Sequence, residues 1–120
     1  MSLSYIVAAY TLDDIKQLAD VVEIIKYHHE FFDGTGYPYG IKEEEIPIGS
    51  RIIAVADAFD SMVTPKVYRQ QIVPSEALAR IKVLVGKQFD PIVVEQFEQI
   101  LPSCLRELKE IERKNLSKSL

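Results

Sequence analysis

Residues 50–63 read SRIIAVADAFDSMV and form the clearest periodic stretch of the chain. Apolar residues recur there at spacings of three and four, which is the pattern of a helix with one buried face. That face comprises Ile52, Val55, Ala56, Phe59 and Val63. The stretch therefore predicts an amphipathic helix, with one carboxylate, Asp57, set among apolar neighbours.

Four further helices are predicted on either side of this stretch from the same periodicity and from start and stop residues. They cover about residues 12–30, 74–85, 91–101 and 103–113. Pro102 is expected to break or kink the chain between the last two, because proline cannot donate a helical hydrogen bond. No useful length of strand-like alternation and no internal repeat is present. The sequence thus predicts an all-α fold, a bundle of about five helices.

The composition restricts the class of protein. The chain has 120 residues, 48% hydrophobic and 27% charged, as in folded globular domains. A net charge of −4 argues against a nucleic-acid-binding protein, which needs a basic surface. The single cysteine, Cys104, excludes an internal disulfide and favours a reducing compartment. No apolar run approaches the roughly 18 residues that span a bilayer, and no signal peptide is evident, so a cytoplasmic domain is expected.

The two histidines of the chain are adjacent, at His28 and His29, near the end of the first predicted helix. Neighbouring helical residues point about 100° apart, so the pair cannot easily face one metal ion. The two side chains could serve two ions side by side, or one could ligate a metal while the other meets a phosphate. The alternative is structural: His29 fills a helix face and His28 lies in water.

Asp57 is the second candidate for chemistry. A buried carboxylate costs several kcal/mol unless it is paired with a cation or binds a metal. Asp57 is therefore expected either to ligate a metal or to form a salt bridge, for instance with Arg51 or Lys66.

The segment DGTGYPYG at residues 33–40 is the third candidate, with three glycines and one proline in eight residues. Such a stretch cannot continue a helix and predicts a tight loop. Backbone amides beside Gly34 and Gly36 can approach a phosphate closely, and the ring of Tyr37 can stack on a base. Asp33 adds a carboxylate, and Pro38 stiffens the loop.

Over about residues 21–101 the chain resembles the HD-GYP domain family. Several elements carry the resemblance in the family's order: His28-His29-Glu30, the loop from Asp33 to Ile41, Ile46-Pro47, Arg51-Ile52, Val55-Ala56-Asp57, Asp60, Tyr68-Arg69, Glu76-Ala77-Leu78, Gly86 with Phe89-Asp90-Pro91, and Phe97. The resemblance implies a bacterial, metal-dependent phosphohydrolase of the HD superfamily that cleaves cyclic di-GMP.

The resemblance also implies roles for single residues. His28, His29 and Asp57 correspond to ligands of a two- or three-iron centre, and manganese or zinc would also suit such ligands. In the family these metals generate a hydroxide and neutralise the phosphodiester. Lys66 and Arg69 correspond to residues that hold the substrate phosphates. The first of these is more often Arg in the family, and Lys lacks the forked grip of Arg.

One family feature is absent from the chain. The family carries a His-Asp pair, closely followed by a Lys, and a further His ligand whose position would fall near Ser4. The chain contains no His-Asp dipeptide and no third histidine. Residues 1–3 are expected to be a remnant of recombinant expression, and residues 4–120 a partial HD-GYP domain without the His-Asp half. Such a chain is expected to be inactive alone and to bind at most one divalent ion weakly.

Two functions remain open from the sequence. The first is a fragment of a phosphodiesterase whose substrate is cyclic di-GMP. The second is a naturally truncated, non-catalytic module that binds signalling proteins, such as diguanylate cyclase (GGDEF) domains, through Gly36, Tyr37 and Pro38. A helix-turn-helix DNA-binding protein has little support, because no basic recognition helix is present.

A homo-oligomer is also expected. Without the upstream helices, the apolar face of the first predicted helix (Ile15, Leu18, Val22 and Ile25) would be uncovered, and self-association would cover it. The alternative is a monomer in which the last predicted helix, through Leu105, Leu108 and Ile111, folds over that face.

Overall fold

The structure is a computed structural model that describes residues 15–68 and 70–119. Its elements are α2 (Ile15–Lys26), the 3₁₀ turn η1 (Glu43–Glu45), α3 (Ile48–Val63), α4 (Pro74–Val83) and α5 (Pro91–Ser119). Among these residues there is no strand, and Val85 and Phe89 form an isolated bridge. The prediction of an all-α fold is confirmed. None of the helices in the described ranges is long and apolar enough to cross a membrane.

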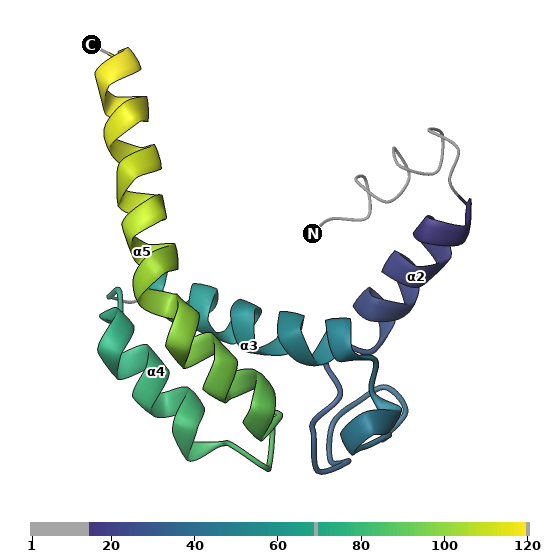
Figure 1. Ribbon diagram of the computed structural model, residues 1–120. Helices are drawn as coiled ribbons and strands as arrows, with labels where there is room; N and C mark the ends of the chain where they lie inside the picture. Colours follow the sequence, from purple (N-terminus) through teal and green to yellow (C-terminus); the bar gives the residue numbers. More distant parts are fainter. Residues whose placement is uncertain (1–14, 69, 120) are drawn as a thin grey trace.

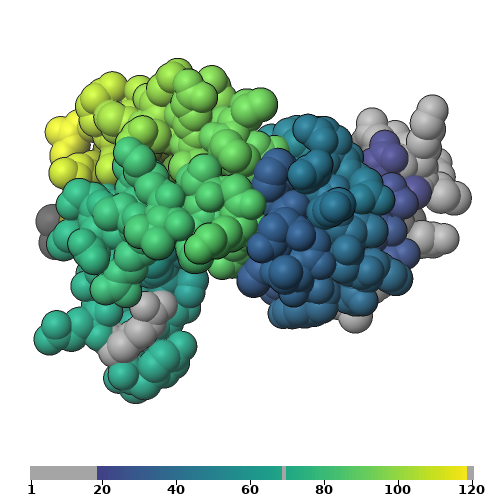
Figure 2. Space-filling model, turned by 90° about the horizontal axis from the view of Figure 1, so that it is seen from below, coloured from purple at the N-terminus to yellow at the C-terminus, as the bar shows by residue number. Residues whose placement is uncertain are grey.

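The helix α3 lies at the centre and packs against α2, α4 and α5 (Figure 1). The helix α4 and the first half of α5 lie side by side against it, whereas α2 meets the opposite end of α3. The loop after α2 touches the turn between α4 and α5, where Phe32 N donates to Gln88 O at 3.1 Å and Asp33 N donates to Lys87 O at 2.8 Å. In Figure 2 the blue part of the chain, which includes this loop, lies directly against the green part, which includes the turn.

The hydrophobic core forms where α3, α4 and α5 meet. Its buried members are Val55, Phe59, Ala77, Ile81, Phe89, Val93, Val94 and Leu101. The inward positions predicted for Val55, Phe59, Val94 and Leu101 are confirmed. Ile52 and Ala56, expected on the same face of α3, are exposed instead. They line an apolar hollow of about 400 Å³ between α3 and α5, so the core covers only part of that face.

The last two predicted helices are one continuous helix, α5, which passes through Pro102. The prediction of a separate fifth helix is therefore wrong. Proline inside a helix removes one hydrogen bond and bends the axis without necessarily ending it. Figure 1 shows α5 changing direction between its first and second halves. Beyond that bend Leu108 and Ile111 are 50% and 55% exposed, so they do not cover α2 as the monomer alternative required.

The first helix ends earlier than its sequence suggested, at Lys26 rather than near Glu30. Tight turns follow, in which His28 N donates to Ile25 O and Glu30 N donates to Tyr27 O. The imidazole Nδ1 of His28 also contacts Ile25 O at the end of the helix. These bonds satisfy the terminal carbonyls in place of a further helical turn. Of the apolar face expected on this helix, Val22 is 42% exposed, and the side chains of Ile15 and Leu18 lie outside the described residues.

The start of α5 is fixed by the buried carboxylate of Asp90, which is 4% exposed. One of its oxygens accepts from Ile92 N at 2.8 Å and from Val93 N at 3.4 Å, which caps the first turn. The other oxygen accepts from Arg51 Nη1 at 2.6 Å. Arg51 also donates through Nε to Ile46 O, so a single pair ties α3 to α5 and to the loop before α3.

Candidate functional site

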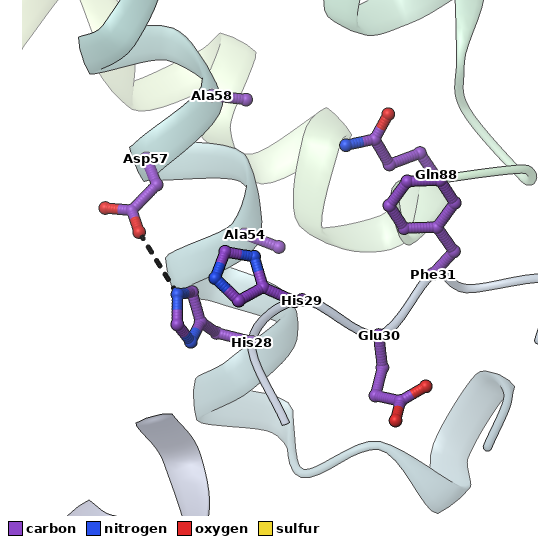
Figure 3. Close-up of a pocket in the computed structure, with 8 residues that line it drawn as sticks. All are labelled: His28, His29, Glu30, Phe31, Ala54, Asp57, Ala58 and Gln88. Atoms are coloured by element: carbon purple, nitrogen blue, oxygen red, sulfur yellow. Dashed lines mark ion pairs between the residues drawn. The ribbon is translucent and has the colours of Figure 1, made fainter. Parts of the chain in front are cut away.

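An open hollow of about 200 Å³ lies between the end of α2, the middle of α3 and the turn before α5 (Figure 3). It is lined by His28, His29, Glu30, Phe31, Ala54, Asp57, Ala58 and Gln88. The structure thus brings together the two histidines and the carboxylate that the sequence singled out, although Asp57 is 28 positions further along the chain than His29.

His28 is oriented by its bond to the end of α2. A carbonyl oxygen can only accept, so the Nδ1 that contacts Ile25 O carries the proton. The other nitrogen, Nε2, then points at Asp57 Oδ2, 3.9 Å away, as the dashed line in Figure 3 marks. An imidazole whose Nδ1–H is held by a backbone carbonyl presents Nε2 as a ligand, which is the common arrangement of metal-binding histidines.

His29 lies between two other rings. Its centroid is 3.9 Å from that of His28 and 5.1 Å from that of Tyr37, which stacks on it at an interplanar angle of 19°. The residue as a whole is exposed, and the two neighbouring rings cover only part of the imidazole. Burial and then the neighbouring His28 lower the pKa of His29, and the Asp57 carboxylate opposes them. The neutral imidazole that results is the form that ligates metals.

The prediction that Asp57 is buried is wrong, because its side chain is 65% exposed. The helix α3 turns this position toward the open hollow, and its charge stays in water. The salt bridge considered for Asp57 with Arg51 does not form, since Arg51 pairs with Asp90. Lys66 lies beyond the end of α3 and does not line the hollow. Arg69 lies outside the described residues.

The glycine-rich loop is folded onto the backbone that carries the histidines. A Cβ at Gly36 would lie 2.3 Å from Phe31 N and 2.7 Å from His29 O, so only glycine fits there. Tyr37 N donates to His29 O at 3.5 Å, and the Tyr37–Pro38 peptide bond is cis. The loop therefore holds Tyr37 against His29, both through its backbone and through its ring.

Asp33 and Gly34 shape the entrance to this loop. Asp33 Oδ1 accepts from the Thr35 hydroxyl at 2.6 Å and from Thr35 N at 3.0 Å. These two hydrogen bonds lower the pKa of Asp33 and keep its carboxylate charged. Gly34 adopts a φ of +85°, which side chains rarely tolerate. Both residues thus act on loop shape, and neither lines the hollow.

A comparison with known protein families identifies the family of this chain. The HD domain family matches residues 3–93. The chain belongs to the HD domain family. A cyclic di-GMP phosphodiesterase of Thermotoga maritima is 51% identical to it over 75 residues, which make up 62% of this chain and 20% of that protein. The 3'3'-cGAMP-specific phosphodiesterase 2 of Vibrio cholerae is 36% identical over 73 residues, 61% of this chain and 14% of that protein.

A solved phosphodiesterase structure has a similar fold. The crystal structure of a cyclic GMP-AMP specific phosphodiesterase of Vibrio cholerae matches with a TM-score of 0.62 and 31% identity, covering 81% of this chain and 21% of that one. These relatives confirm the resemblance to HD-GYP proteins. The chain spans only 14–21% of the length of each of the three.

The hollow of this HD domain offers metal donors that suit a divalent ion: the imidazole nitrogens of His28 and His29 and the carboxylate of Asp57. The neutral state of His29 and the fixed Nε2 of His28 fit that role. The described residues nevertheless contain no group of three or more His, Cys, Asp or Glu side chains already gathered for a metal ion. The donor chemistry fits, but three ligands are fewer than an octahedral ion requires.

Two polar residues that line the hollow, Glu30 and Gln88, were not assigned a role from the sequence. Glu30 is 3% exposed and accepts from Tyr39 N and Gly40 N, which closes the glycine-rich loop. Gln88 enters the hollow from the turn before α5, to which Phe32 is hydrogen-bonded. Only the adjacency of Glu30 to the histidines could have indicated its role, and nothing in the local pattern places Gln88 there.

Replacing Glu30 by glutamine is expected to lower the free energy of unfolding by about 2 kcal/mol, since a buried charge-assisted acceptor is replaced by an amide. The NH₂ of glutamine would face the amide donors of Tyr39 or Gly40. Urea denaturation measures the change. Glu44→Gln, in the exposed 3₁₀ turn, is the matched control and should change stability by less than about 0.5 kcal/mol. Equal effects of the two variants would contradict the role given to Glu30.

Proposed function

We propose that this chain supplies the C-terminal part of a metal-dependent phosphodiesterase site for cyclic dinucleotides, with cyclic di-GMP as the substrate. The observation that carries the proposal is the placement of His28, His29 and Asp57 around one open hollow beside the glycine-rich loop. The activities named for the relatives support it, since both are phosphodiesterases of cyclic dinucleotides. With such a substrate we propose a bacterial, cytoplasmic location, which the free cysteine, Cys104, supports.

In this proposal the side chains of the hollow bind and orient a divalent metal. His28 offers Nε2, His29 offers a neutral ring held by Tyr37, and Asp57 offers an exposed carboxylate. A divalent ion, with iron favoured by the family resemblance, activates water and neutralises a phosphodiester when bound. Lys66 and Arg69, which correspond to the phosphate-binding residues of the family, would bind the substrate phosphates.

A second function is favoured by the exposure of the loop. Tyr37 and Tyr39 are 61% and 57% exposed, although both belong to a loop whose backbone is tightly fixed. Exposed aromatic rings on a rigid support are typical of protein contact surfaces. We therefore propose, as the alternative, that the loop binds a signalling protein such as a GGDEF domain while the chain itself hydrolyses nothing.

Metal titration of the purified chain separates these functions. Because the ligand shell is incomplete, we expect at most one Fe²⁺ or Mn²⁺ ion to bind weakly, and hydrolysis of cyclic di-GMP to be undetectable. Calorimetry should show the binding lost in Asp57→Ala and kept in Asp60→Ala, a control on the exposed side of the same helix.

Binding that survives Asp57→Ala would contradict the metal site. Turnover by the wild-type chain that Asp57→Ala abolishes would contradict the expected inactivity. Absence of any metal binding, together with capture of a GGDEF domain that Tyr37→Ala prevents, would favour the second function.

A further inference from the structure

The second half of α5 leaves the rest of the molecule. Residues 103–119, called here the α5 extension, project beyond the ends of α3 and α4 (Figure 1). From Ser103 to Lys118 every residue except Leu105 is exposed. At 1.5 Å per residue the extension is about 25 Å long. An isolated helix of this length is marginal in water, so its stability calls for a packing partner.

The buried face of α5 continues along the extension. Val94, Phe97 and Leu101 pack into the core at spacings of three and four. The same alternation proceeds through Cys104, Leu108, Ile111 and Asn115, called here the α5 stripe. Leu108 and Ile111 are 50% and 55% exposed. Alternating spacings of three and four are the heptad pattern of a coiled coil, and a single Asn in such a seam commonly fixes its register.

The charges beside the α5 stripe distinguish the two possible directions of a partner helix. In a parallel pair Glu107 would face Glu112 of the other helix, which places like charges together. In an antiparallel pair centred between Leu108 and Ile111, Glu107 of each helix would face Lys114 of the other. The two-fold symmetry of the pair would thus give two such ion pairs. No ion pair within the described part of the chain uses Glu107 or Lys114, so both charges are available for it.

We propose that the α5 extension pairs with the same segment of a second copy of this chain as an antiparallel two-stranded coiled coil. Leu108 of each copy packs on the partner's Ile111, and Cys104 lies opposite the partner's Asn115. Glu107 forms an ion pair with the partner's Lys114 on both sides of the two-fold axis. This surface differs from the interface expected on the first helix, and it requires neither metal nor substrate.

Charge exchange tests the interface in the full chain. Light scattering over a concentration series should give a two-chain mass for the wild type. Glu107→Lys and Lys114→Glu each place like charges opposite one another, and each should shift the mass toward one chain. The double variant restores the pairs and should restore the two-chain mass. Arg106→Glu changes the net charge as much as Lys114→Glu, but on the outer face, and should leave the two-chain mass unchanged.

A cysteine cross-link tests the direction of the helices. Asn115→Cys should give a covalent dimer under mild oxidation, because Cys104 would face the partner's new thiol. The wild type should not, since its two Cys104 residues lie at opposite ends of the seam. A one-chain mass for the wild type, or a two-chain mass in both single charge variants, would overturn the proposal. So would a cross-link in the wild type but not in Asn115→Cys.

Discussion

Replacing Asp90 by alanine is expected to lower the free energy of unfolding by about 3–5 kcal/mol. The change leaves Arg51, whose side chain is 15% exposed, without its partner in the interior. It also removes the oxygen that accepts from Ile92 N and Val93 N at the start of α5. Loss of a helix cap alone typically costs about 1 kcal/mol, so the unpaired cation accounts for most of the expected effect.

Urea denaturation followed by circular dichroism measures this change, and two variants separate its causes. Asp90→Asn keeps a cap acceptor but loses the charge, so its cost should fall between those of wild type and Asp90→Ala. Glu76→Ala breaks an exposed pair with Arg80 and should cost less than about 0.5 kcal/mol. If Asp90→Ala cost no more than Glu76→Ala, the pair with Arg51 would contribute nothing to stability.

The helices could be predicted from the sequence because their apolar faces repeat at a period that only a helix satisfies. Val55 and Phe59 on α3, and Val94 and Leu101 on α5, are buried as that period requires. Helix ends were less predictable. The end of α2 depends on a hydrogen bond between His28 and Ile25 O, and the continuity of α5 depends on how the chain accommodates Pro102.

Side-chain environments were predictable only where a single element determines them. Asp57 stands among apolar neighbours in sequence, yet α3 turns it toward water, because burial depends on what packs against each face. Arg51 pairs with Asp90, 39 positions away, rather than with Asp57. Glu30 acquires its role only when the loop returns to it nine and ten residues later. Candidate residues can thus be chosen from local patterns and family resemblance, but their partners follow from tertiary contacts.

Replacing Gly36 by alanine is expected to lower the free energy of unfolding by about 3 kcal/mol, the upper end of the usual cost of overpacking. The added Cβ would lie 2.3 Å from Phe31 N, 2.7 Å from His29 O and 2.8 Å from Glu30 C. All three neighbours are backbone atoms, which cannot move aside as a flexible side chain could. The loop and the segment that carries the histidines must therefore separate.

Gly86→Ala is the matched control for this substitution. Gly86 has a φ of +82° and no atom within 4 Å of an added Cβ, so alanine there meets only backbone strain, about 1 kcal/mol. Denaturation should rank the two variants in that order. Nuclear magnetic resonance should show the ring signals of His28 and His29 shifted in Gly36→Ala and unchanged in Gly86→Ala.

The histidine signals decide whether the loop acts on the site or only on stability. Tyr37 follows Gly36 directly and stacks on His29, so displacing the loop removes this stacked ring from the imidazole. A Gly36→Ala chain that is destabilised but keeps both histidine signals in place would show that the loop is a structural support alone. A chain with shifted signals would show that the glycine is needed because the loop orients His29.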